Sequence, residues 1–365
     1  MLYFSNMSMK RFLVVLPILL TIFCLPIMAQ TEKSQIPLAD PYILLEDGTY
    51  YAYGTYDADG IRCYSSTDLK YWKYRGLALN KANTTESRWF WAPEVYHVGD
   101  KYIMYYSANE HLYAATAKSP MGPFRQVGSY QMESLLKNEK CIDSHAFFDT
   151  DGTAYLFFVR FTDGNCIWQV KLADDCITPV AGTLKKCLSA TDSWELKLGK
   201  VTEGPNVYKQ GIRYFLTYSA NDYQSQDYAV GYALSANIAR GNWSKSSYSP
   251  FLHRWNGLYG TGHHSLFTDK DGQLRIVFHA HDSKENIHPR RMYIGSVSCS
   301  GNIMRMSPAP MVVPVLGNAP TSVETIASDV SAPQLCYSTD GLRRTIPTHG
   351  INIIRQGKNV RKVLK

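Results

Sequence analysis

The stretch Val201-Thr202-Glu203-Gly204-Pro205-Asn206-Val207 places one carboxylate between a β-branched approach and a Gly-Pro break. Shortly after it, a turn at Gln210-Gly211 leads into an aromatic segment that runs from Tyr214 to Tyr218. A glutamate in an apolar strand costs free energy to bury unless it is paired or has a chemical role. The same order of parts, a polar residue, then a turn, then an aromatic strand, occurs five times in the chain, and this repetition predicts the fold.

The five units follow one another at intervals of 51 to 61 residues, measured between their turn glycines. Each turn glycine provides the positive φ of a tight hairpin, and each run that follows is rich in aromatic and β-branched residues, as strands are. Units of about 50 residues that each supply four strands are typical of β-propeller blades. We therefore predict an all-β chain with a five-bladed β-propeller. The alternative, a β-sandwich with chance turns, does not explain five units in register. The turn glycines are Gly48, Gly99, Gly152, Gly211 and Gly272.

The innermost strand of each predicted blade carries polar residues before its turn. Asp40, Asp143, Glu203 and His263 lie eight or nine residues before their turn glycines. Residues at equal depth on the inner strands of a closed ring converge on its central channel, so the repeat predicts a ring of three carboxylates and a histidine. Taken singly, an Asp-Pro is usually a turn, a Glu-Gly-Pro a loop, and a His-His a surface pair. The shared spacing is what favours a functional site.

The N-terminus has the pattern of an export signal. A basic pair, Lys10-Arg11, precedes an apolar run from Phe12 to Met28, and Ala29 stands at a plausible cleavage position. A membrane anchor is the alternative, but the run is short for a span and contains two prolines. We predict a signal region at 1–29, a propeller at 30–316 and a C-terminal tail at 317–365. The mature protein is expected in the periplasm, at the cell surface or in the medium, with no membrane span.

Composition argues against other classes of protein. The formal charge of +7 comes partly from basic residues that are spread through the tail among polar and apolar ones, so nucleic-acid binding is not indicated. The eight cysteines show no C-x-x-C spacing, so no zinc site is indicated either. We expect a monomer that requires no cofactor.

With these motifs in place, the chain resembles glycoside hydrolase family 43, five-bladed propeller enzymes that act on arabinose- and xylose-containing glycans. The resemblance implies that Asp40 is the general base, Glu203 the general acid, and Asp143 an ionised residue that orients the acid and raises its pKa. Inverting hydrolysis needs such an acid and base about 6.5–9.5 Å apart, which leaves room for the attacking water. The resemblance to the family covers about Ile36 to Leu316. It rests on Ala39-Asp40-Pro41, Trp91-Ala92-Pro93-Glu94-Val95, Ile142-Asp143, Glu203-Gly204-Pro205 and Gly260-Thr261-Gly262-His263-His264-Ser265.

Four further residues are candidates for substrate binding. His263 matches a channel histidine that accompanies calcium or ordered water in several family members, so the resemblance implies a structural calcium held through water. A purely structural role for His263 is the alternative. Arg291 matches an arginine that reaches the bound sugar, and Arg290 is the alternative because strand alternation turns only one of the two inward. Trp91 and Phe90 are candidates for an apolar wall against a sugar face, with packing between blades as the competing role.

We therefore expect an inverting glycoside hydrolase that cleaves arabinofuranosidic or xylosidic bonds of plant oligo- or polysaccharides. One alternative is another specificity, for galactosides or fructosides. A β-fructosidase needs an Asp-Pro-Asn-Gly motif, whereas Tyr42 follows Asp40-Pro41 here. The other alternative is a non-catalytic glycan-binding propeller. The presence of all three carboxylates argues against it. The segment from Gly317 is too short for the β-sandwich of many family members and looks like a sorting-type tail or a small β module.

Overall fold

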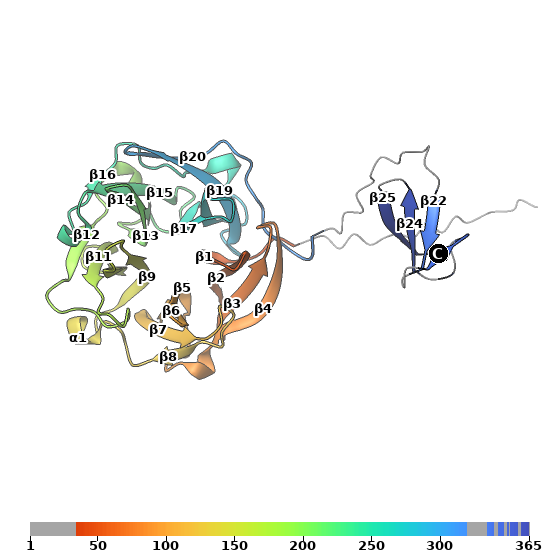
Figure 1. The fold of residues 1–365 in the computed structure, drawn as a ribbon. Helices are drawn as coiled ribbons and strands as arrows, with labels where there is room; N and C mark the ends of the chain where they lie inside the picture. Colours follow the sequence, from red (N-terminus) through yellow and green to blue (C-terminus); the bar gives the residue numbers. More distant parts are fainter. Residues whose placement is uncertain are drawn as a thin grey trace, which may run out of the picture. The chain divides into compact units, whose positions relative to one another are not determined.

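The computed structural model describes residues 34–319 and, further along the chain, 334–338, 342–346, 349, 351–356 and 359–364. Its strands form six sheets. Five of these sheets are the blades of a propeller and lie around a common centre (Figure 1). The predicted five-bladed propeller is confirmed. The predicted signal region at 1–29 lies outside the described residues.

Within each blade the strands follow chain order from the innermost strand outward. Blade I consists of β1 (Ala39–Glu46), β2 (Thr49–Asp57), β3 (Gly60–Ser66), β4 (Tyr71–Asn80) and β21 (Val315–Leu316). Blade II consists of β5 (Trp91–Val98), β6 (Lys101–Ala108), β7 (His111–Ala117) and β8 (Arg125–Val127). Blade III consists of β9 (Cys141–Phe148), β10 (Ala154–Arg160), β11 (Cys166–Lys171) and β12 (Lys185–Leu188).

Blades IV and V have the same plan. Blade IV consists of β13 (Thr202–Gln210), β14 (Arg213–Ala220), β15 (Ala229–Ser235) and β16 (Ser244–Lys245). Blade V consists of β17 (Gly262–Thr268), β18 (Leu274–Ala280), β19 (Arg291–Ser300) and β20 (Ile303–Met306). The helices in the described ranges are single turns in connecting loops: η1 (Lys81–Asn83), α1 (Glu133–Leu136), η2 (Ser193–Glu195), η3 (Ile238–Arg240) and η4 (Trp255–Gly257).

The ring closes where its two ends meet. Along the centre, β1 contacts both β17 and β5, and the contacts continue through β9 and β13 back to β17. At the rim, β21 pairs in parallel with the outer strand β4. The segment before β1 forms hydrogen bonds with the segment before β21 and with β19. The Ile36 N–H donates to the Pro314 carbonyl at 3.1 Å, and the Met292 N–H donates to the Ile36 carbonyl at 3.2 Å. The two ends of the propeller therefore hold blades I and V together.

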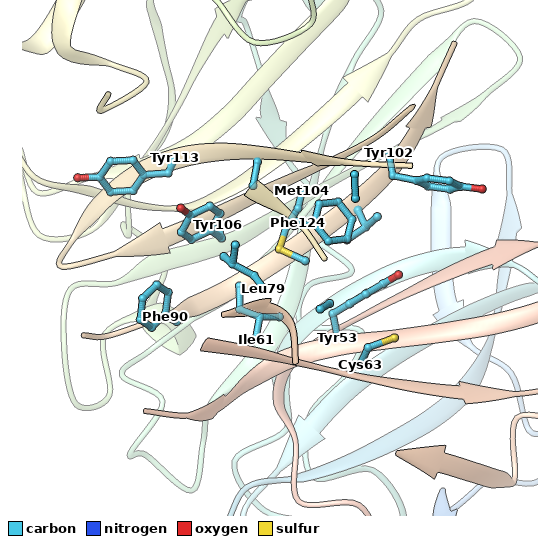
Figure 2. Close-up of a cluster of buried hydrophobic side chains, with 14 of the residues drawn as sticks. Tyr53, Ile61, Cys63, Leu79, Phe90, Tyr102, Met104, Tyr106, Tyr113 and Phe124 are labelled. Atoms are coloured by element: carbon cyan, nitrogen blue, oxygen red, sulfur yellow. The ribbon is translucent and has the colours of Figure 1, made fainter. Parts of the chain in front are cut away.

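Apolar cores lie between adjacent blades, because each sheet buries both of its faces against its neighbours. Figure 2 shows the core between blades I and II, with Tyr53 and Ile61 from blade I close to Met104 and Tyr106 from blade II. All four of these side chains are fully buried. Burial of apolar surface is worth roughly 25 cal/mol per Å², and aromatic side chains bury the most area. Tyrosines such as Tyr53 and Tyr106 therefore serve as packing between blades.

A β-bulge interrupts every inner strand at the same place. The pairing register shifts there in all five blades. The residue at the bulge has positive φ in each case: Asp40 (48°), Ala92 (41°), Asp143 (57°), Gly204 (51°) and His263 (44°). A bulge bends its strand and re-aims the side chain it carries. The expectation that all four polar residues lie at equal depth is wrong for Glu203, because Gly204 occupies the bulge and Glu203 precedes it.

The C-terminal segment contains a sheet of its own. Its strands are ordered β23 (Arg343–Arg344), β22 (Gln334–Tyr337), β24 (Ile351–Gln356) and β25 (Asn359–Leu364), and all neighbours are antiparallel. Strands β22 and β24 lie in the middle, and Ile354 of β24 is buried. The small β module expected in this segment is thus present. Nowhere in the described ranges is there a helix long and apolar enough to cross a membrane.

Candidate active site

A pocket of about 590 Å³ lies at the bulged ends of the inner strands, and every blade contributes to its lining. Its volume falls within the range of small-molecule sites. The structure brings four sequence-predicted residues together in it, namely Asp40 from blade I, Asp143 from blade III, Glu203 from blade IV and His263 from blade V. All three carboxylates are buried.

Nitrogen groups of blade V surround Asp40. Its Oδ1 lies 2.7 Å from a terminal nitrogen of Arg290, 3.3 Å from Nδ1 of His263 and 3.3 Å from Nδ1 of His279. Burial alone raises the pKa of this carboxyl, but the charge of Arg290, together with His263, outweighs burial and holds the pKa well below its usual value. Asp40 is therefore ionised at neutral pH, as a general base must be.

Glu203 is held by neutral donors. The hydroxyl of Tyr228 donates to Oε1 at 2.8 Å, and the side-chain amide of Asn165 donates to Oε2 at 3.0 Å. Burial raises the pKa of Glu203 to about 7, with the charge of Asp40 adding to the rise and the two hydrogen bonds opposing it. A carboxyl group with this pKa keeps its proton in weakly acidic to neutral solution, as a general acid must.

A glycine makes room for the tyrosine that positions Glu203. A Cβ atom on Gly262 would lie only 2.3 Å from the ring of Tyr228. Any other residue at this position would therefore displace the ring and its hydrogen bond to Glu203. This close approach is a structural reason for the glycine just before His263 in blade V.

Asp143 contacts the strand that carries Glu203. Its Oδ2 accepts the backbone N–H of Gly204 at 3.3 Å, which ties it to the residue after Glu203. Burial raises the pKa of Asp143 well above its usual value, and the charges of Glu203 and then Asp40 raise it further. Two buried carboxyls that repel each other titrate as a pair, so a proton on one of them favours the charged form of the other. The expected arrangement, an ionised Asp143 beside a protonated Glu203, is one of the two ways in which this pair can share a proton, and it stays a prediction.

The backbone N–H groups of the bulges explain why Asp143 takes this position. In four blades the bulge N–H donates to a side chain on the second strand of the preceding blade. The equivalent position on the second strand of blade III is Val159, whose side chain has no polar atom. Gly204 therefore donates to Asp143 instead. The four pairs are Ala92 to Thr55 at 2.9 Å, Asp143 to Ser107 at 3.0 Å, His263 to Ser219 at 2.7 Å and Asp40 to Nδ1 of His279 at 3.1 Å.

The two aromatic candidates for substrate binding lie in different environments. Trp91 lines the pocket, and its ring stacks on that of Trp89 with centroids 5.7 Å apart. Phe90 is 2% exposed and lies in the core between blades I and II, where its ring stacks on Tyr106 (Figure 2). The prediction that Phe90 binds substrate is therefore wrong. Adjacent residues point in opposite directions where β5 begins, and Phe90 is the one that faces the core.

The two arginine candidates also lie in different environments, and only one of them lines the pocket. Arg290 contacts Asp40 and lines the pocket, and its guanidinium lies 4.6 Å above the ring of Tyr223. Arg291 is the first residue of β19, and its side chain pairs with Asp282. Arg291 is therefore not the pocket arginine, and its alternative, Arg290, is. Strand alternation correctly limited the choice to one of the two but did not decide which.

The residues around His263 do not form a direct calcium cage. Calcium takes six to eight oxygen ligands, whereas the one carboxylate that contacts His263 is Asp40, which also pairs with Arg290. In the part of the chain that the structure describes, no group of three His, Cys, Asp or Glu side chains could hold a metal ion. Burial lowers the pKa of His263, so the imidazole is neutral in neutral solution. A calcium held through water stays a prediction.

Three residues of the site were missed at the sequence level: Asn165, Tyr228 and His279. His279 had a detectable signal, since it is a polar residue within the apolar strand β18. Asn165 lies in the loop between β10 and β11, and Tyr228 just precedes β15. Neither belongs to a repeated motif, so no spacing argument selects it.

Comparison with known proteins gives a consistent result. A family model described as glycosyl hydrolases family 43 matches residues 34–297. A solved structure titled endo-1,4-beta-xylanase from Bacteroides thetaiotaomicron shows 43% sequence identity and a TM-score of 0.74, covering 79% of this chain and 99% of that one. A thermostable family-43 glycoside hydrolase shows 29% identity and a TM-score of 0.70, covering 77% and 97%.

Curated relatives match less of their own length. The extracellular exo-alpha-(1->5)-L-arabinofuranosidase of Streptomyces avermitilis is 28% identical over 278 residues, which are 68% of this chain and 55% of that protein. The chain spans about half the length of the curated relatives it matches first. The family model, in contrast, covers most of the described propeller, including all three carboxylates and the bulge of every blade. The chain belongs to glycoside hydrolase family 43.

Proposed function

We propose that the protein is an inverting glycoside hydrolase that cleaves arabinofuranosidic or xylosidic bonds in plant polysaccharides. One observation supports this most strongly: a single pocket contains a carboxyl group whose pKa is held low, Asp40, and another whose pKa is raised to about 7, Glu203. Paired carboxyls whose environments push their pKa values apart are the pattern expected of a base and an acid working together.

In this proposal the ionised Asp40 takes a proton from a water, which attacks the anomeric carbon as Glu203 gives its proton to the leaving oxygen. Arg290 and His263 keep Asp40 charged and oriented. Tyr228 and Asn165 fix the direction of the Glu203 carboxyl. Asp143 competes with Glu203 for a proton, so its negative charge favours the protonated acid. Trp91 offers an apolar face to the bound sugar.

The names of the relatives support pentose glycans as the substrate class without choosing between two sugars. The 43% identical structure is named a xylanase, and the 28% identical curated relative an arabinofuranosidase. Export is proposed on two grounds: the signal pattern of residues 1–29 and the word extracellular in the names of several relatives. We propose a sorting role for the C-terminal segment on its sequence pattern alone.

The test is a substrate panel followed by product stereochemistry. Nitrophenyl α-L-arabinofuranoside, β-D-xyloside and β-D-galactoside, with linear arabinan and xylan, separate the sugars. Proton NMR of the first product should then show the anomer opposite to the substrate. Retention of configuration would contradict the inverting assignment and favour a fructosidase-like mechanism. Tight binding of a glycan without hydrolysis of any substrate would favour the non-catalytic alternative.

A further inference from the structure

A second hollow adjoins the catalytic pocket. It has a volume of about 540 Å³ and is lined by Glu110, Glu139, Lys140, Phe161 and Thr162. Glu110 and Phe161 also line the pocket that contains the three carboxylates. Glu110 belongs to the turn between β6 and β7, and Phe161 to the loop between β10 and β11. The two hollows therefore form one groove, which leaves the pocket between blades II and III.

The groove begins on the acid's side of the pocket. Phe161 opens the β10–β11 loop, and Asn165, which donates to Oε2 of Glu203, ends it. Asp40 is instead surrounded by blade V residues. In hydrolysis with a general acid, the leaving oxygen must lie next to that acid. The groove that starts at the β10–β11 loop is therefore placed to receive the part of the substrate that departs.

This loop is fixed to the strand that carries Glu203. The Asn165 N–H donates to the Lys200 carbonyl at 3.0 Å, and the Thr202 N–H donates to the Asn165 carbonyl at 3.0 Å. A Cβ atom on Gly164 would lie 2.0 Å from the Lys200 carbonyl oxygen, so only glycine permits this close approach. The position of Phe161 is thereby coupled to the position of the acid.

The lining of the groove suits a sugar ring. Phe161 is 43% exposed, a large solvent-facing area for an aromatic side chain beside a catalytic pocket. The charged groups around it are paired, Glu110 with Lys140 and Glu139 with Arg160, so they offer hydrogen bonds without an isolated charge. A pyranose or furanose presents an apolar C–H face and polar edges, which match an aromatic surface bordered by polar groups.

We infer that this groove binds the leaving-group part of an oligosaccharide, with Phe161 as the stacking surface for the first sugar beyond the scissile bond. The inference rests on the proposed function for the direction of the chain. It implies a substrate that is an oligomer or polymer rather than a single terminal sugar on a small aglycone.

The experiment compares Phe161→Ala with wild type on a methyl glycoside and on oligosaccharides of the pentose that wild type hydrolyses. A methyl group places no ring in the groove. We expect kcat/KM on the oligosaccharides to fall about tenfold, which corresponds to ~1.4 kcal/mol. The fall on the methyl glycoside should be much smaller, and Phe161→Trp should restore the oligosaccharide activity. Phe148→Ala is the matched control, since Phe148 is 37% exposed at the far end of β9 from Asp143.

Binding distinguishes failure of the inference from failure of the proposed function. Calorimetry with arabino- and xylo-oligosaccharides in an Asp40→Asn background should show weaker binding when Phe161→Ala is added, whether or not wild type is hydrolytic. Weaker binding without any hydrolysis by wild type would retain the groove and remove the proposed function. An equal fall on methyl glycoside and oligosaccharide, or no fall on either, would overturn the inference.

Discussion

The two sides of the pocket, one with the proposed base Asp40 and the other with the proposed acid Glu203, have the same backbone and opposite electrostatics. On the base side, Asp40 occupies a bulge and contacts a guanidinium and two imidazoles. On the acid side, Glu203 precedes the equivalent bulge and contacts a phenol, an amide and, through Gly204, a second carboxyl. Burial raises the pKa on both sides, and only on the base side do cationic and imidazole neighbours reverse it.

The difference shows how a repeated blade acquires distinct chemical roles. The bulge is common to all blades, so what varies is the side chain that the preceding blade's second strand presents to it. Blade V presents His279 to Asp40, whereas blade III presents Val159 to Gly204, so the acid side recruits Asp143 to complete the hydrogen bond. Ionisation in the pocket is therefore decided by the neighbouring blade as much as by the strand that carries the carboxyl.

The largest effect is expected from Asp40→Asn. The amide cannot accept a proton from water, and general base catalysis contributes roughly a hundredfold to ten-thousandfold in rate. We expect kcat to fall by about that amount on every substrate, including those with good leaving groups, because leaving-group protonation is not the lost step. The measurement is kcat across a series of aryl glycosides, with circular dichroism as the control for folding. Recovery of activity with the best leaving groups would show that Asp40 is not the base.

Glu203→Gln should have the next largest effect, and one that depends on the substrate. The variant loses proton donation to the leaving oxygen, which matters most when the leaving group is a sugar alkoxide. We expect a large fall in kcat on oligosaccharides and a much smaller one on nitrophenyl glycosides. Plots of log kcat against leaving-group pKa should be steeper than for wild type. If the two variants show equal slopes, the acid and base are reversed or misplaced.

Asp143→Asn should change the pH dependence more than the maximal rate. Wild-type activity is expected to fall as the pH rises through the pKa of Glu203, about 7, because the acid loses its proton there. Removing the carboxylate of Asp143 removes a repulsion that raises the pKa of Glu203. The alkaline limb of the pH–rate profile should therefore move to lower pH. Burial still raises the pKa of Glu203, so the shift is partial. The pH–rate profile of kcat/KM measures it, and an unmoved limb would make Asp143 a structural or sugar-binding residue.

The sequence predicts the parts of this pocket that repeat and misses those that do not. Five turn glycines and the recurring spacing of Asp40, Asp143 and His263 suffice for the propeller and for the centre of the site, because a closed ring converts equal spacing into proximity. Spacing does not say which of two adjacent residues faces inward where a strand begins, so Phe90 and Arg291 were misplaced. Tyr228 and Asn165 come from loops, which have no period.

The smallest effect is expected from Val159→Thr. This variant tests whether the acceptor that the preceding blade offers to the bulge N–H determines the ionisation on each side of the pocket. Thr55 holds the equivalent position in blade I, and its Oγ1 accepts the N–H of Ala92 at 2.9 Å. A threonine at 159 has almost the same shape as valine and would offer Gly204 the same acceptor. A buried hydroxyl without a partner is costly, so the new hydrogen bond should form. Asp143 would then lose the donor that stabilises its charged form.

The pKa of Asp143 should therefore rise, and the proton that it shares with Glu203 should rest more often on Asp143. The effective pKa of Glu203 falls as a result, so the alkaline limb of kcat/KM should move to lower pH, by less than in Asp143→Asn. Val159→Ala is the matched control, because it removes side-chain volume from the same buried position without adding an acceptor, and it should lower stability but leave the limb in place. An equal shift in both variants would mean that packing at 159, and not the hydrogen bond to Gly204, determines the proton balance of the acid side.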